Sequence, residues 1–286
     1  MTRLLAAVIL LCSLAPAAWA QRSAEWLERS RPVPPQRIAG NLYYVGTNDL
    51  AAFLFTSPRG HVLLDGGLPE TALLILDAIR RLGFRPEDVR VLINSHAHFD
   101  HAGGLAELKR RTGARLAASE RDAEQLERGG RGDFALGDSA GYPPVTVDRR
   151  LGDGDTVRVG DVVLTAHPTP GHTRGCTTWT TTIRERGGDY SVVLMCSLSV
   201  LPNYRLTGEE SYPGILADYR RSIAVLRALP CEIMLAAHAS FIDGFHEKLA
   251  GIRETGSVRP LVNSSACRDY ADRAEQRLEA HLARTP

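Results

Sequence analysis

The sequence lacks the features of a membrane-spanning or nucleic-acid-binding protein. Beyond residue 20, no run of about eighteen apolar residues occurs, which is the length that a bilayer-spanning helix needs. Lys and Arg together number 34 against 33 for Asp and Glu, and no basic stripe or interleaved aromatic patch is present. We therefore expect no membrane anchor and no nucleic-acid partner.

The first twenty residues are typical of a secretory signal peptide. The basic start Met1-Thr2-Arg3 precedes an apolar run over residues 4–14, and Ala18-Trp19-Ala20 has the small-x-small pattern of a cleavage site. We expect cleavage after Ala20 and export to the periplasm. Cys12 is not preceded by the small residue that a lipidated cysteine normally requires, which argues against a lipoprotein anchor.

Cysteine is scarce, with 5 in the chain, and four of these lie beyond the expected cleavage site. An even number of cysteines in an exported protein favours disulfides. Cys196 ends a predicted strand and Cys231 opens the next one, so we predict a Cys196–Cys231 bridge. A pair between Cys176 and Cys267 is a weaker alternative, and free thiols remain the alternative for both of these residues.

The chain after the signal peptide, residues 21–286, is long enough for one large α/β domain. After an irregular arm over residues 21–40, two series of short β-like runs occur, and helical patterns follow the strands in each series. The expected strands lie at 41–46, 51–56, 61–65, 89–93, 114–118, 156–159, 162–167, 177–183, 191–195 and 232–237. The expected helices lie at 69–82, 104–112, 120–128, 215–229, 244–249 and 271–282. Two facing β-layers with helices outside would bury this pattern, and the loops at the strand ends would meet at one edge.

Three histidines and one aspartate fall within six residues, His96-Ala97-His98-Phe99-Asp100-His101. Imidazole nitrogen and carboxylate oxygen are the ligands that Zn²⁺ selects, and folding alone rarely requires four such donors so close together. The cluster directly follows the apolar strand expected at 89–93, so it lies at the carboxyl end of that strand. Four donors at this spacing favour a pair of metal ions.

Two further histidines have settings that suit a metal ligand. His172 lies in a tight turn between two predicted strands, and His238 ends the apolar run 233–237, a strand-end position like that of His96. The remaining histidines lack such settings. We expect His281 on a helix surface and three histidines in structural roles: His61, His167 and His246. The Gly- and Asp-rich stretch 129–142 is expected to form a mobile loop near the mouth of the site.

This combination of motifs resembles the metallo-β-lactamase superfamily. The His-x-His-x-Asp-His stretch followed by Gly103-Gly104 is similar to the family signature, and Leu64-Asp65-Gly66-Gly67, Pro170-Gly171-His172-Thr173 and His238 support it in the family's order. The likeness covers residues 40–250. It implies a four-layer αβ/βα sandwich with a two-metal site at the edge between the β-layers.

The resemblance implies a role for each donor. It assigns the first zinc to His96, His98 and His172, and the second zinc to Asp100, His101 and His238. It also implies that Asp65 orients the ligands from outside the metal sphere, with an ordinary turn aspartate as the alternative.

The segment after residues 191–195 bears on the subgroup. Glyoxalase II-like thioesterases, lactonases and zinc-dependent phosphodiesterases carry a metal-bridging aspartate there, whereas this chain has Cys196-Ser197-Leu198-Ser199. A serine at this place, with His101 beside Asp100, is similar to the third subclass of metallo-β-lactamases. In the first subclass a cysteine there binds the second metal. We favour Ser197 as the matching residue and keep a thiolate ligand at Cys196 as the alternative.

The resemblance implies an enzyme that hydrolyses the β-lactam amide bond and so confers antibiotic resistance. A hydroxide held between two zinc ions would attack the carbonyl, with Asp100 orienting it. Ser197 and Ser199 would bind the substrate carboxylate, or are plain edge residues. We expect a monomer that acts on a small β-lactam. The alternatives are a lactonase or thioesterase of the same fold, or a non-catalytic periplasmic zinc-binding protein.

Overall fold

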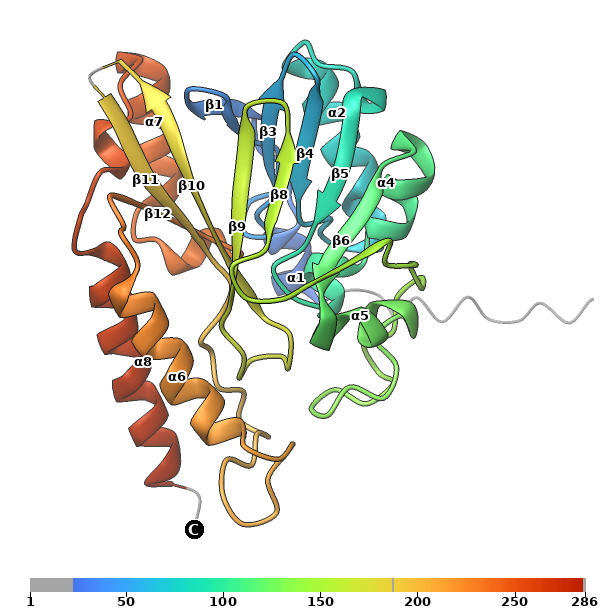
Figure 1. Ribbon diagram of the computed structural model, residues 1–286, viewed down its shortest axis with the longest axis vertical. Helices are drawn as coiled ribbons and strands as arrows, with labels where there is room; N and C mark the ends of the chain where they lie inside the picture. The colour runs from blue at the N-terminus through green and yellow to red at the C-terminus, as the bar shows by residue number, and fades with distance from the viewer. Residues whose placement is uncertain (1–22, 187, 285–286) are drawn as a thin grey trace, which may run out of the picture.

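The computed structural model describes residues 23–186 and 188–284, and the predicted signal peptide with Cys12 lies outside these residues. Two β-sheets face each other, and helices cover the outer face of each sheet (Figure 1). Within the described residues, one sheet has seven strands in the order β1-β2-β3-β4-β5-β6-β7, and the other has five in the order β12-β11-β10-β9-β8. The expected four-layer αβ/βα sandwich is confirmed.

The first sheet changes from antiparallel to parallel pairing at β4. The pairs from β1 to β4 are antiparallel, whereas β4, β5, β6 and β7 run parallel to one another. Its strands are β1 (Gln36–Ala39), β2 (Leu42–Tyr44), β3 (Phe53–Ser57), β4 (Gly60–Leu64), β5 (Val89–Ile93), β6 (Arg115–Ser119) and β7 (Arg149–Leu151). Parallel pairing requires crossover connections, and these supply the outer helices: α2 (Ala72–Arg81), α4 (Leu105–Thr112) and α5 (Glu120–Glu127).

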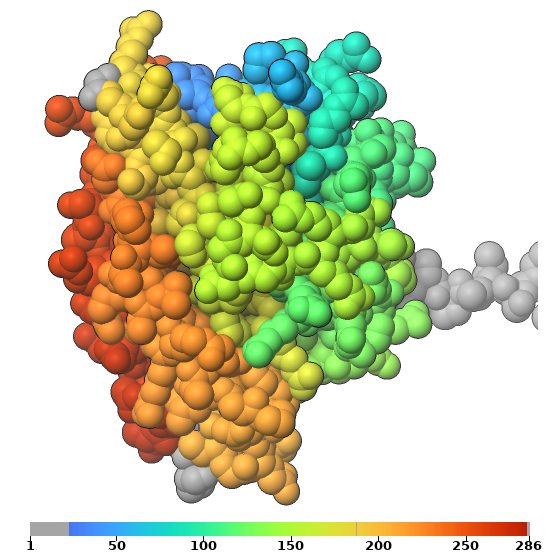
Figure 2. All heavy atoms as spheres, viewed as in Figure 1, coloured from blue at the N-terminus to red at the C-terminus, as the bar shows by residue number. Residues whose placement is uncertain are grey.

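The second sheet is antiparallel except at one edge, where β11 pairs with β12 in parallel. Its strands are β8 (Thr156–Val159), β9 (Val162–Pro168), β10 (Thr177–Glu185), β11 (Gly188–Met195) and β12 (Ile233–Ala236). The later helices are α6 (Ile215–Ala228), α7 (Phe245–Thr255) and α8 (Ala266–Leu282), and α6 and α8 lie side by side outside this sheet (Figure 1). In the space-filling view, the yellow-green surface of β8 and β9 occupies the centre of the face (Figure 2).

Short helical pieces complete the described chain. They are α1 (Ala24–Arg29), α3 (Phe99–Ala102), and the 3₁₀ turns η1 (Pro69–Thr71), η2 (Pro86–Asp88), η3 (Ala239–Phe241) and η4 (Arg259–Leu261). Among the described residues, no helix has the length and apolar character that crossing a membrane requires.

Two apolar cores hold the layers together. One fills the space between the sheets, where Phe53, Phe55 and Trp179 are almost wholly buried, and it continues under α6 and α8. The other lies between the first sheet and its helices. There α2 turns Ile75 and Ile79 inward, as the 3.6-residue period of its sequence predicts. Removing apolar surface from water stabilises both cores by about 25 cal/mol per Å² buried.

The expectation of an irregular arm over residues 21–40 was wrong. Ser23 caps α1 by accepting a hydrogen bond from the Trp26 amide at 3.4 Å, and the Trp26 ring packs on Phe99 with ring centroids 5.0 Å apart. Strand β1 then pairs with β2. The interactions that order this arm come from distant residues, which the local sequence does not reveal. His281, expected on a helix surface, is buried, and its Nε2 lies 2.8 Å from the Tyr204 carbonyl oxygen.

The predicted Cys196–Cys231 disulfide was also wrong, because the structure pairs Cys176 with Cys196 and Cys231 with Cys267. Strands β11 and β12 are parallel, so Cys196 after β11 and Cys231 before β12 lie at opposite ends of the pair. Strands β10 and β11 are antiparallel, which brings Cys176 before β10 next to Cys196, with their Cα atoms 5.9 Å apart.

We expect the Cys231→Ser/Cys267→Ser double variant to lose about 3–4 kcal/mol of unfolding free energy, because the bridge closes a long loop in the unfolded chain. Urea unfolding under matched conditions measures this loss. Peptide mapping without reductant should recover Cys176 linked to Cys196. Recovery of a Cys196–Cys231 peptide would contradict the observed pairing.

Candidate metal centre

The histidine-rich segment lies at the carboxyl end of β5 and is held by the second sheet. The Thr177 amide donates to the Ser95 carbonyl at 2.8 Å, and the Trp179 indole donates to the Asn94 carbonyl at 3.0 Å. On the other side, a Cβ at Gly104 would come within 2.2 Å of the Gly66 carbonyl oxygen, so only glycine permits this close approach. Contacts from both sheets therefore fix the histidine-rich segment that follows β5.

A first cluster comprises His96, His98 and His172, whose candidate ligand atoms lie within 4.8 Å of one another. The Nδ1 atom of His98 faces Nε2 of His172 at 3.1 Å, and Nε2 of His96 is buried with no hydrogen-bond partner. Burial and the neighbouring imidazoles lower the pKa of His96 and of His172 well below the ordinary value. Both rings are therefore neutral at pH 7 and have a lone pair for a cation.

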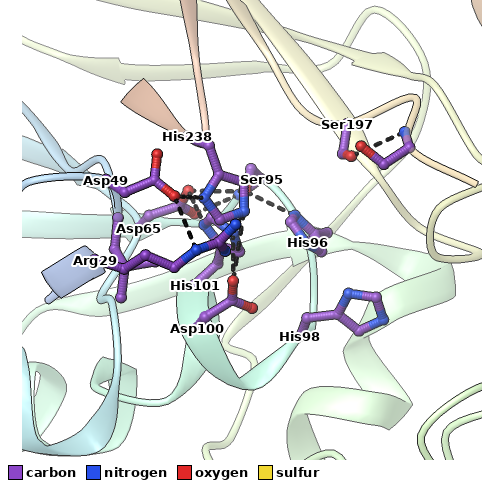
Figure 3. A network of polar contacts seen from close by, with 12 residues as sticks. Arg29, Asp49, Asp65, Ser95, His96, His98, Asp100, His101, Ser197 and His238 are labelled. Atoms are coloured by element: carbon purple, nitrogen blue, oxygen red, sulfur yellow. Dashed lines mark hydrogen bonds and ion pairs between the residues drawn. The ribbon is translucent and has the colours of Figure 1, made fainter. Parts of the chain in front are cut away.

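A second cluster lies next to it, formed by Asp100, His101 and His238 (Figure 3). The Nε2 atoms of His101 and His238 are 3.0 Å apart, and Asp100 Oδ2 lies 3.3 Å from the first and 3.4 Å from the second. The His101 and His96 rings have centroids only 4.3 Å apart, so the two clusters adjoin.

In four of the five ligand rings, the nitrogen that faces away from the cluster has a hydrogen-bond partner, whereas His98 Nε2 is buried without one. Acceptors hold three of them: Asp65 Oδ2 lies 3.3 Å from His101 Nδ1, Asp49 Oδ2 lies 3.1 Å from His238 Nδ1, and the Ser199 carbonyl lies 2.9 Å from His172 Nδ1. Such partners fix the tautomer and direct the other nitrogen inward. Ser95 Oγ lies 3.0 Å from His96 Nδ1, and Asp133 Oδ2 lies 3.7 Å from His98 Nε2.

The second cluster attracts positive charge. Burial acts to raise the pKa of Asp100, yet the adjacent His101 ring draws that pKa below its ordinary value. Burial acts to lower the pKa of His101, but the carboxylates of Asp100 and Asp65 raise it to about 10. The negative charge that favours the proton on His101 would also favour a dication at this position.

The donor set fits metal ions. Two pairs of imidazole nitrogens face each other at 3.0 and 3.1 Å, and Nε2 of His96 is buried without a hydrogen-bond partner, which a bound cation would supply. Imidazole and carboxylate donors in two clusters of three suit Zn²⁺, and three protein ligands leave a coordination position open. The structure therefore brings together all six predicted ligands.

Asp65 lies where the sequence placed it, at the turn after β4. It has a positive φ of 65°, which is uncommon outside glycine, and two bonds from Ser95 fix its carboxylate. The Ser95 amide donates to Oδ1 at 2.6 Å, and the Ser95 hydroxyl donates to Oδ2 at 2.8 Å. Its carboxylate therefore joins the turn, the ligand segment and the His101 ring.

Sequence reasoning missed Asp49, Asp122 and Asp133. Asp49 is buried, and Arg29 Nε lies 3.6 Å from its Oδ2, the same oxygen that His238 Nδ1 approaches at 3.1 Å (Figure 3). An aspartate in a loop or in the first turn of a helix has an ordinary structural explanation, so no local signal marks these three residues. Asp133 does, however, lie within the stretch 129–142, which was expected near the site.

The segment after β11 differs from a metal-binding thiolate site. The sulfur atoms of Cys176 and Cys196 lie near His96, with Cys196 Sγ 3.6 Å from its Nδ1, but they are bonded to each other. Cys196 therefore has no free thiolate to offer a metal. Ser197 is buried and its Oγ accepts a hydrogen bond from the Ser199 amide at 3.2 Å, whereas Ser199 is partly exposed.

Comparison with known proteins agrees with this geometry. A model of the metallo-beta-lactamase superfamily matches residues 48–238. The FEZ-1 metallo-β-lactamase from Legionella gormanii is 40% identical, with a TM-score of 0.86 over 89% of this chain and 97% of that one. The chain belongs to the metallo-β-lactamase superfamily.

Within that superfamily, the resemblance to the third subclass is confirmed. BJP-1, a subclass B3 metallo-β-lactamase of Bradyrhizobium japonicum, is 35% identical, with a TM-score of 0.84 over 90% of this chain and 96% of that one. A hydroxyacylglutathione hydrolase of Methylobacterium nodulans is 36% identical over 98 residues, but the match spans only 30% of its length and 34% of this chain.

We expect Asp65→Ala to weaken metal binding at the second cluster by about 10- to 100-fold, because His101 loses the partner that orients it. The substitution also leaves the buried Ser95 amide unpaired, which costs about 1–3 kcal/mol of unfolding free energy. Competition with a chromophoric chelator and urea unfolding measure the two effects. Asp65→Asn keeps one acceptor, so its metal affinity should lie between those of the unmodified protein and Asp65→Ala. Unchanged affinity in both variants would contradict this role.

Proposed function

We propose that this protein is a zinc-dependent β-lactamase that hydrolyses the β-lactam amide bond. The observation that carries the proposal is the pair of adjoining clusters, in which five imidazoles and Asp100 direct their donor atoms to one buried edge between the sheets. We assign one zinc to His96, His98 and His172, and a second zinc to Asp100, His101 and His238. The likeness to enzymes described as metallo-β-lactamases supports the substrate class.

Two bound dications would lower the pKa of coordinated water toward 7 and polarise the carbonyl that the water attacks. The protein's own groups supply orientation. Asp100 presents a carboxylate oxygen to His101 and His238 and lies within 4.8 Å of a ligand atom of His96, where it can hold the proton of the attacking water. Asp65 and Asp49 keep His101 and His238 from turning as charge develops. No serine nucleophile is required.

We also propose that the chain is exported to the periplasm and acts there as a monomer. Two disulfides in the described part of the chain support export, because such bridges persist in oxidising compartments. Hydrolysis of β-lactams in that compartment would give antibiotic resistance.

A thioesterase or lactonase of the same fold is the second candidate. The partial match to a hydroxyacylglutathione hydrolase favours it. Against it, the position after β11 holds Cys196-Ser197 in place of the bridging aspartate that those enzymes carry. The resemblance to subclass B3 over nearly the whole chain weighs further toward the β-lactamase.

Hydrolysis of a chromogenic cephalosporin by the purified protein tests the proposal. We expect turnover with added zinc, its loss on treatment with a chelator, and its return when zinc is restored. Metal analysis should find two zinc ions per chain. Absence of turnover in a protein that holds two zinc ions would exclude the β-lactamase and favour an ester, thioester or lactone substrate.

Single variants check the ligand assignment in the same assay. We expect His98→Ala and Asp100→Ala to lower kcat/KM by about 1000-fold or more, because several kcal/mol of transition-state stabilisation depend on the metals. His167→Ala is a matched control, since this ring contacts Thr180 away from the site at 2.8 Å. Retained turnover in both ligand variants would refute the two-metal assignment.

The serines after β11 are proposed to bind the substrate carboxylate. Because Ser199 is the more exposed of the two, we expect Ser199→Ala to raise KM by about 10-fold with little change in kcat, as for the loss of one hydrogen bond to a charged group. The methyl ester of the same substrate is the control, and its KM should be unaffected. Equal increases for acid and ester would show that Ser199 is an ordinary edge residue.

A further inference from the structure

One buried carboxylate near the first cluster has no part in the chemistry described above. Asp122 lies in the first turn of α5 and is only 2% exposed. In the part of the chain that the structure describes, no Lys, Arg or His side chain forms an ion pair with it. Burial raises the pKa of Asp122 to about 6. A buried carboxylate of this kind is costly, and the surrounding contacts indicate what offsets the cost.

Among the described residues, every hydrogen bond to the Asp122 carboxylate comes from the two segments that carry the first cluster. Its Oδ2 accepts from the Ala97 amide at 2.8 Å and from the Thr173 hydroxyl at 2.9 Å, and its Oδ1 accepts from the Gly175 amide at 2.8 Å. Ala97 is the residue between His96 and His98. Thr173 directly follows His172, and Gly175 lies three residues after it. One carboxylate therefore bonds to residues next to or near all three histidines.

The surrounding packing leaves this carboxylate little freedom. A Cβ on Gly175 would lie 2.4 Å from the Asp122 amide nitrogen and 2.6 Å from its Cγ, so the His172 loop rests directly on the first turn of α5. Ser119 donates to the Gly175 carbonyl at 2.7 Å and accepts from the Asp122 amide at 3.2 Å. The Ala97 carbonyl is held from the other side by the Tyr142 hydroxyl at 2.6 Å.

We propose that Asp122 is a positioning residue for the first metal site. It fixes the spacing between the His96-Ala97-His98 segment and the His172 loop, and its negative charge favours a cation held by the three histidines. The inference deepens the proposed function and rests on its ligand assignment. It differs from the roles of Asp65 and Asp49, which contact rings of the second cluster.

The two sites can be tested separately in backgrounds that each keep one cluster complete. His238→Ala leaves the first cluster intact, and His98→Ala leaves the second. Zinc affinity is measured in each background by competition with a chromophoric chelator, with and without Asp122→Asn. We expect the zinc dissociation constant to rise by about 10- to 100-fold in the His238→Ala background, and by less than about twofold in the His98→Ala background.

Cobalt substitution provides a second measurement, the visible spectrum of bound Co²⁺, which a general loss of stability would not change. The visible d–d bands of Co²⁺ report ligand geometry, so Asp122→Asn should shift them in the His238→Ala background only. Asp148→Asn is the matched control. Its carboxylate also accepts from a backbone amide, that of Leu116 at 2.7 Å, but it pairs with Lys109 away from the clusters. We expect no change in zinc affinity for this control.

A second pair of variants covers the case in which Asp122→Asn fails to fold. Thr173→Val removes one hydrogen bond to Asp122 with little change in shape, and Thr173→Ser retains the hydroxyl. In the His238→Ala background, we expect weaker zinc binding for the valine variant and restored binding for the serine variant. Equal affinities for these two variants would overturn the role of the contact.

The remaining outcomes are decisive in different ways. Equal losses of zinc affinity in both backgrounds, or no loss in either, would show that Asp122 only stabilises the fold. If the His238→Ala parent binds no zinc while the unmodified protein does, the ligand assignment of the proposed function fails, and this inference fails with it. If the parent binds zinc and Asp122→Asn binds it equally well, the proposed function stands and only the inference fails.

Discussion

The rest of the structure depends on the convergence of imidazole nitrogens at one buried edge. His98 and His172 face each other across 3.1 Å, and His101 and His238 across 3.0 Å. Nε2 of His96 is buried there without a hydrogen-bond partner, which costs about 1–3 kcal/mol, and a bound dication would remove that cost. Metal binding is therefore expected to stabilise the folded state.

Holding such an arrangement requires both sheets. The donors of the first cluster come from the loop after β5 in one sheet and from the turn before β10 in the other. The second cluster likewise joins the end of β5 to His238, which follows β12. Because each cluster spans the interface, neither exists unless the sheets are packed, and the apolar core between them is a precondition of the chemistry.

The sequence predicted the parts of this site that local patterns encode. The strands before each ligand segment, the six donors and the turn at Asp65 lie where periodicity and motif placed them. The outer partners were not predictable, since they depend on packing between distant segments. Asp122 stands three residues after Ser119, a spacing typical of a helix cap, and its contacts with Ala97 and Gly175 span 25 and 53 residues.

The disulfide pairing also depends on packing between distant segments, and so could not be predicted from the sequence. Chain order suggested pairing Cys196 with Cys231, but parallel pairing of β11 with β12 separates them. The antiparallel pair β10 and β11 instead brings Cys176 beside Cys196, next to His96. This bridge joins the segment after His172 to the one that supplies the Ser199 carbonyl to His172, so it restrains the loop at both ends. The strand order that made the predicted pairing wrong thus places the Cys176–Cys196 disulfide beside the first cluster, where it restrains the His172 loop.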